Sequence, residues 1–225
     1  MKKAGYLLAL VLGVSSIGFA AACPSSQLLS VYDTAGYSCT IGPLVFSNFT
    51  YAAATPPAAS GVTVTTVTGS EIGFTLTAPP NGWTGVSNDY ILDYTVGVDT
   101  AICPLCKIDD ALLAMTATVS GTGFATISET STSPGSNVNL SVCAGIPGCP
   151  LTVTTTFPAT SSLSLVKDIF VFNGTGTATI TSISQEFSLQ TPEPASLALL
   201  GTALLGAGAI LRRRLGRRAT EAGEN

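Results

Sequence analysis

The chain has 225 residues, of which 46% are hydrophobic and 10% are charged, and its formal net charge is −4. It contains no histidine, which excludes Ser-His-Asp and Cys-His nucleophilic sites, zinc sites with histidine ligands and the usual general base near neutral pH. Between Cys23 and Pro194 there are two basic and eleven acidic residues, a net charge of 2 − 11 = −9, so this segment repels nucleic acid and anionic lipid.

Residues 1–22 have the pattern of a secretory signal peptide. Two lysines precede an apolar run over residues 5–19, and three small alanines follow at residues 20–22. We expect cleavage after Ala22, which makes Cys23 the first residue of the mature chain. An alternative is that the protein is a lipoprotein with lipid attached to Cys23, although Ala20 stands where a lipobox usually carries leucine.

Six cysteines in an exported chain predict disulfides, because the compartment outside the cytoplasm is oxidising. Many pairings are open, and proximity in sequence favours three: Cys23 with Cys39, Cys103 with Cys106, and Cys143 with Cys149. The Cys103-Pro104-Leu105-Cys106 spacing also suits a thioredoxin-like redox pair, but no helix pattern accompanies it, so we favour a loop disulfide. A four-cysteine zinc site is disfavoured because these thiols would pair with each other.

From about residue 62 to residue 189 the chain is a succession of short segments rich in Thr, Val, Ile and Phe, the residues that suit strands. The clearest is residues 90–98, where Tyr90, Leu92, Tyr94 and Val96 share one face. Similar alternation occurs over residues 72–76, 113–119, 138–142 and 151–157.

Turn signals separate these segments, and Pro79-Pro80-Asn81-Gly82, Pro134-Gly135 and Asn173-Gly174 are the clearest. We expect Asn173-Gly174 to join residues 169–172 and 175–180 in a hairpin. The pattern predicts an all-β fold over residues 23–190, an antiparallel β-sandwich or jelly roll outside the cytoplasm.

After residue 190 the composition changes. Residues 195–211 are apolar and uncharged, long enough for a short transmembrane helix. An arginine cluster over residues 212–218 follows at once, and the positive-inside rule then makes residues 215–225 a cytoplasmic tail.

Pro192-Glu193-Pro194, the apolar segment and the arginines Arg212, Arg213 and Arg214 together resemble the PEP-CTERM sorting signal over residues 191–214. The resemblance implies that an exosortase-type processing enzyme recognises these residues and delivers the chain to the cell surface or an exopolysaccharide matrix of a bacterium. Before processing, the C-terminal helix would anchor it in the inner membrane. A second similarity lies near the N-terminus. The N-terminal part of a group of proteins with the same tail is similar to Cys39-Thr40-Ile41-Gly42 and Phe46-Ser47-Asn48-Phe49. This similarity implies no particular activity.

We expect no enzyme activity and no catalytic residues. A structural, adhesive or polysaccharide-contact role is the main prediction. A first alternative is a carbohydrate-binding module that uses Trp83, the single tryptophan, and exposed tyrosines such as Tyr90 or Tyr94.

A second alternative is a carboxylate-dependent glycan hydrolase, which needs two acids in one cleft. The candidate acids are Asp89, Asp93, Asp109, Asp110 and Glu129. These carboxylates are scattered and do not alternate as in a calcium loop, so we expect neither a metal site nor a cofactor.

Overall fold

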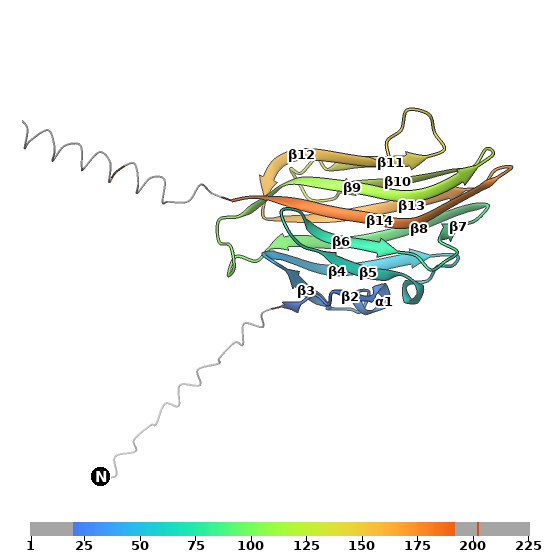
Figure 1. The fold of residues 1–225 in the computed structure, drawn as a ribbon. Coiled ribbons are helices and arrows are strands. Elements are labelled where there is room, and N and C mark those ends of the chain that lie inside the picture. Colours follow the sequence, from blue (N-terminus) through green and yellow to red (C-terminus); the bar gives the residue numbers. More distant parts are fainter. Residues whose placement is uncertain (1–19, 192–201, 203–225) are drawn as a thin grey trace, which may run out of the picture.

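A computed structural model describes residues 20–191 and residue 202 of the chain. In this part nearly all regular structure is β, arranged as two sheets packed face to face (Figure 1). No helix in it is long and apolar enough to cross a membrane. The expected signal sequence up to residue 19, the Pro-Glu-Pro tripeptide at residues 192–194, the arginine cluster and all of the expected membrane helix except Thr202 lie outside the described residues.

The first sheet, which we call sheet A, has its seven described strands in the order β1-β3-β4-β8-β13-β10-β11. All its pairs are antiparallel except the short β1–β3 pair. In that spatial order the strands are β1 Ala21–Ala22, β3 Ser38–Ile41, β4 Leu44–Ala53, β8 Ser87–Val98, β13 Ser162–Phe172, β10 Phe124–Ser131 and β11 Asn139–Ala144.

The second sheet, sheet B, has the order β12-β9-β14-β6-β5-β2, and β7 pairs with β14 beside this path. The pairs between its described strands are antiparallel. The strands are β12 Thr152–Thr160, β9 Lys107–Ser120, β14 Thr177–Gln190, β6 Ile72–Thr77, β5 Thr63–Val67, β2 Ser26–Leu28 and β7 Trp83–Thr84. The helical elements in the same part are α1 (Leu29–Tyr32) and the 3-10 turn η1 (Ala59–Gly61).

Side-chain alternation explains how the strands bury one face. In β8 the predicted residues Tyr90, Leu92, Tyr94 and Val96 are at most 2% exposed, and the residues between them face outward. The inward faces of both sheets meet in one core, where Phe74 of sheet B stacks edge-on against Phe46 and Tyr94 of sheet A. The all-β sandwich expected from sequence is therefore present.

Most connections in the second half of the molecule pass from one sheet to the other. The strands β8, β10, β11 and β13 belong to sheet A, whereas β9, β12 and β14 belong to sheet B. The hairpin expected at Asn173-Gly174 is thus wrong, because β13 and β14 do not pair and the turn joins the two layers. Asn173 Oδ1 accepts the backbone N–H of Ala178 at 2.8 Å, which holds the turn closed without a strand ladder.

Three disulfides join Cys23 to Cys39, Cys103 to Cys106 and Cys143 to Cys149, the pairs expected from proximity. The first attaches the N-terminal segment to β3, where the Cys23 N–H also donates to the Thr40 carbonyl at 2.8 Å. The sulfur of Cys23 is therefore bonded to Cys39 and is not available as a thiol for lipid attachment. Cleavage after Ala22 would remove β1 but leave this disulfide in place.

Candidate functional site

The outward side of sheet A carries three partly exposed phenyl rings beside two carboxyl groups, and we call this set the aromatic–acidic face. It consists of Phe124, Phe170, Phe172, Asp89 and Asp168. The ring centroids of Phe170 and Phe172 lie 5.9 Å and 5.3 Å from that of Phe124, both tilted by 42°. The register places Phe124 opposite Phe172, and Phe170 opposite Asp89, so the residues come from three neighbouring strands.

Asp168 interacts with Asp89 on this face. Partial burial raises the pKa of Asp168 to about 6, and the hydrogen bond to Asp89 and its negative charge raise it further in the same direction. Ile91, opposite Asp168, is 39% exposed and extends the apolar surface. The face therefore combines apolar ring surface with hydrogen-bonding carboxyl groups.

The period of two along β13 produces this face. Leu165, Lys167 and Ile169 point into the core, which sends Asp168 and Phe170 outward. The sequence alone did not single out Asp168 or Phe170. The available signal was the composition of residues 165–172, where apolar residues occupy both faces of β13. A strand with one solvent-exposed face usually carries polar residues on that face.

The outward side of sheet B has a different character, dominated by hydroxyl groups. The hydroxyls of Thr75 and Ser184 are hydrogen bonded at 2.9 Å, and Ser188 donates to Glu71 at 2.8 Å. Hydrogen bonds between short polar side chains are therefore typical of this surface, whereas sheet A presents phenyl rings and carboxyl groups.

The expected sugar contact through Trp83 does not fit the structure. Trp83 is 0% exposed, and its indole Nε1 donates to the hydroxyl of Tyr51 at 2.9 Å. Tyr90 and Tyr94 are 0% and 2% exposed. The alternation of β8 places residues 90 and 94 on its buried face. Trp83 lies in β7, which pairs with the first part of β14.

The candidate acids do not gather in one place. Asp89 belongs to the aromatic–acidic face, and Asp93 accepts a hydrogen bond from Thr50 at 3.3 Å on the same side of sheet A. Asp109 and Asp110 lie in β9 of sheet B. Glu129 is fully buried between the sheets. Within residues 20–191, the structure shows no group of three or more Cys, Asp or Glu side chains that could hold a metal ion.

Glu129 belongs to a buried polar cluster that sequence reasoning did not anticipate. The cluster consists of Glu129, Lys167, Gln185 and Tyr94. Glu129 Oε2 accepts hydrogen bonds from Lys167 Nζ and from the hydroxyl of Tyr94, the latter at 3.1 Å. Lys167 Nζ also donates to Gln185 Oε1 at 2.8 Å. The alternation in β13 placed residue 167 inward, which was the one signal available from sequence.

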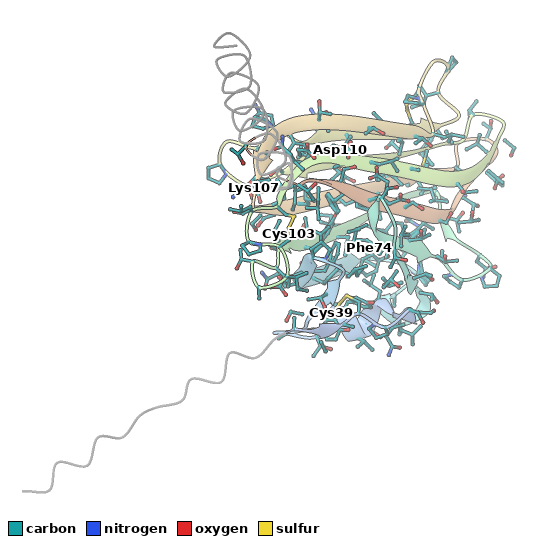
Figure 2. The ribbon with its side chains drawn as sticks, turned by 60° about the vertical axis from the view of Figure 1, so that its left-hand side comes forward. Cys39, Phe74, Cys103, Lys107 and Asp110 are labelled. Carbon is teal, nitrogen blue, oxygen red and sulfur yellow. A yellow bond between two sulfur atoms is a disulfide. The ribbon has the colours of Figure 1, made fainter. Side chains whose placement is uncertain are left out.

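The sandwich ends where the sorting tail begins. Lys107 at the start of β9 pairs with Gln190 at the end of β14, and the disulfide loop of Cys103 and Cys106 precedes Lys107 directly. Figure 2 shows Cys103 and Lys107 together at this end of the molecule. The loop exposes Ile102 by 59% and Leu105 by 70%. The proposed recognition residues themselves, Pro192, Glu193, Pro194, Arg212, Arg213 and Arg214, lie outside the described residues.

Comparison with known proteins identifies the tail. Residues 190–214 match the PEP-CTERM protein-sorting motif. The chain is thus an exported protein with an exosortase-type sorting signal, anchored transiently in a membrane before processing. No curated protein matches the sequence.

Two solved structures are similar to parts of the sandwich. One is TmCBM61 in complex with β-1,4-galactotriose, at 11% identity and a TM-score of 0.31, covering 65% of this chain and 90% of that one. The other is the enzymatically active domain of tailspike protein 4 of bacteriophage CBA120, at 19% identity and a TM-score of 0.25, covering 62% of this chain and 19% of that one.

Proposed function

We propose that this exported chain is a non-catalytic protein of the cell surface or exopolysaccharide matrix, and that its sandwich contacts polysaccharide through the aromatic–acidic face. An exosortase-type enzyme would process the tail and leave the domain outside the cell. The observation that carries the proposal is the grouping of Phe124, Phe170 and Phe172 beside the carboxyls of Asp89 and Asp168.

This grouping suits the chemistry of a sugar ring. The phenyl faces offer apolar surface to the C–H side of a sugar, and carboxyl oxygens accept hydrogen bonds from its hydroxyls. Exposed apolar surface rimmed by polar groups is typical of an interaction site. The face is the flat side of a sheet, which suits an extended polymer better than a small molecule enclosed in a pocket.

The charge of the domain narrows the class of polysaccharide. Residues 20–191 contain two basic and ten acidic residues, 2 − 10 = −8, and of the two lysines Lys167 is fully buried. Lys107 is then the one exposed cation of this part of the chain. We therefore propose a neutral or cationic polymer, because an anionic one would be repelled.

The same geometry favours contact over hydrolysis. Glycoside hydrolases hold their two carboxyl groups at least about 5 Å apart, so that a sugar or a water fits between them. Asp89 and Asp168 instead interact directly, and this interaction raises the pKa of Asp168. We accordingly propose that the pair holds a sugar without cleaving its bonds.

Affinity electrophoresis of the purified full chain in gels containing a polysaccharide tests the proposal. Dextran serves as the neutral polymer, chitosan as the cationic one and alginate as the anionic one. We expect retardation by dextran or chitosan and none by alginate. Phe170→Ser should abolish the retardation, whereas Leu151→Ser, at an exposed apolar residue beside sheet B, should leave it unchanged. Unretarded migration in all three gels, or equal loss in both variants, would overturn the proposal.

A further inference from the structure

The buried polar cluster places an amine against a carboxamide in the interior of the sandwich. Lys167 Nζ lies 2.8 Å from Gln185 Oε1, and Lys167, Gln185 and Glu129 are all 0% exposed. Lys167 sits on β13 between Glu129 of β10 and Leu92 of β8, and Gln185 sits on β14 between Leu113 of β9 and Phe74 of β6. The amine and the carboxamide thus come from opposite sheets.

We propose that Lys167 and Gln185 form an intramolecular isopeptide bond that joins the two sheets covalently, with Glu129 as the proton carrier. Burial acts here as in other sites that activate an amine, where removal of water makes the neutral form accessible. The inference concerns the interior of the domain and does not depend on the proposed polysaccharide contact.

Two atoms of the cluster support this assignment. Glu129 Oε1 and Gln185 Nε2 are buried, and neither has a hydrogen-bond partner in the structure. An unpaired buried polar atom destabilises a fold, so a stable domain rarely keeps two in one cluster. Loss of Gln185 Nε2 as ammonia would remove one of them, and the other is the carboxylate oxygen free to carry the proton.

The electrostatics of the cluster point the same way. Burial lowers the pKa of Lys167, and the Glu129 carboxylate opposes that shift only in part. A neutral, nucleophilic amine is therefore more accessible at this position than on a surface lysine. Gln185 is the electrophile in this assignment because its carboxamide has a buried, unpaired Nε2 to lose, whereas Glu129 lies where it can take the proton from Nζ.

The step balances without an external reagent. The lone pair of the neutral Nζ attacks Cδ of Gln185, forming the new N–C bond. The proton released from Nζ passes through the Glu129 carboxyl group to Nε2, and the Cδ–Nε2 bond breaks with departure of ammonia. The products are a secondary amide and one molecule of ammonia, so no oxidation or reduction occurs. The terminal Gln185 torsion must turn the face of the carbonyl group toward Nζ, and such torsions are soft.

Digestion of the unfolded wild-type chain tests the bond directly. After export and purification, the protein is reduced, unfolded and cut with a protease specific for lysine. An acylated Lys167 resists cleavage, so we expect residues 108–167 to remain joined to the chain that follows. The joined fragment should be lighter than its sequence by the mass of one ammonia. Exposed Lys107 must be cut in the same sample, and it serves as the internal control.

Two variants locate the chemistry. Glu129→Gln removes the proton carrier and Gln185→Met removes the electrophile, and both should restore cleavage after Lys167 with no loss of mass. Full cleavage after Lys167 in the wild-type chain would overturn the proposal, whether or not either variant folds. Loss of one water in place of ammonia would assign the bond to Glu129 and would equally overturn it.

Discussion

Asp168 is an exposed acid whose pKa is shifted by its surroundings. Its ordinary pKa of 3.8 is raised to about 6, first by burial and then by Asp89. A raised pKa means that the folded state binds the proton more tightly than the unfolded state, so this contribution to stability is full below about pH 4 and disappears as the pH rises through about 6. Because Asp168 is exposed, solvent screening keeps the effect below about 1 kcal/mol.

We therefore expect Asp168→Asn to flatten the pH dependence of stability. The amide cannot lose a proton, and it still donates a hydrogen bond to Asp89. Urea unfolding at pH 5 and pH 7.5 measures the effect: the wild-type chain should lose a few tenths of a kcal/mol more than the variant between the two values. Glu186, whose pKa burial also raises, is present in both proteins, so it does not contribute to the difference. Equal losses would show that folding does not raise the pKa of Asp168.

At the level of elements, the turns between the sheets are packed against each other. Gly174 has a φ of +57°, and a Cβ added there would lie 2.3 Å from Thr122 Oγ1 and 2.8 Å from the Thr122 carbonyl oxygen. Thr122 belongs to the β9–β10 turn, which also crosses between the layers. The two crossings therefore support one another at one end of the sandwich, where Thr122 Oγ1 accepts the Thr175 N–H at 2.9 Å.

Gly174→Ala should consequently destabilise the fold more than Gly135→Ala does. Gly135 has a φ of +81° and nothing within 4 Å of an added Cβ, so it isolates the backbone cost of a side chain at positive φ, about 1–2 kcal/mol. Gly174→Ala adds a clash with the backbone, which costs a further ~1–3 kcal/mol. Urea unfolding of both variants gives the comparison, and an equal loss would contradict the packing of the two turns.

The elements also show where sequence reasoning succeeded and where it failed. Strict alternation in residues 90–98 identified a strand and its buried face correctly. The turn at Asn173-Gly174 was misjudged because turn residues fix the local bend, whereas the choice between a hairpin and a crossing depends on which sheet the next strand joins. The candidate sugar contact at Trp83 failed and the burial of Lys167 was not anticipated, since burial of an aromatic or a charge depends on partners distant in sequence.

At the scale of the whole molecule, the sorting motif at residues 190–214 and the Cys23–Cys39 disulfide make a joint prediction. The intact mass of the protein recovered from its native cells should correspond to a chain that begins at Cys23, ends near Pro194, contains three disulfides and carries no lipid. Lipid is excluded because its attachment needs the sulfur that Cys39 occupies. A mass that includes a diacylglyceryl group would contradict the disulfide.

Replacement of the motif residue Glu193 tests the other end of the chain. Glu193→Ala should leave the tail uncut and keep the full chain in the membrane fraction, because the processing enzyme would no longer recognise the tripeptide. Glu221→Ala, beyond the motif, should have no effect and is the matched control. Identical processing of both variants would show that recognition does not use Glu193.

The position of β14 has a consequence for the order of events during export. This strand is the last of the sandwich, yet it lies inside sheet B, between β9 and β6. A chain that leaves the cytoplasm from its N-terminus delivers β14 after every other strand. Sheet B can therefore be completed only when residue 190 has crossed, which is the moment at which the sorting motif reaches the membrane. The topology therefore couples two events in time. Sheet B can complete its hydrogen bonding only when the tail that follows β14 becomes accessible to a processing enzyme.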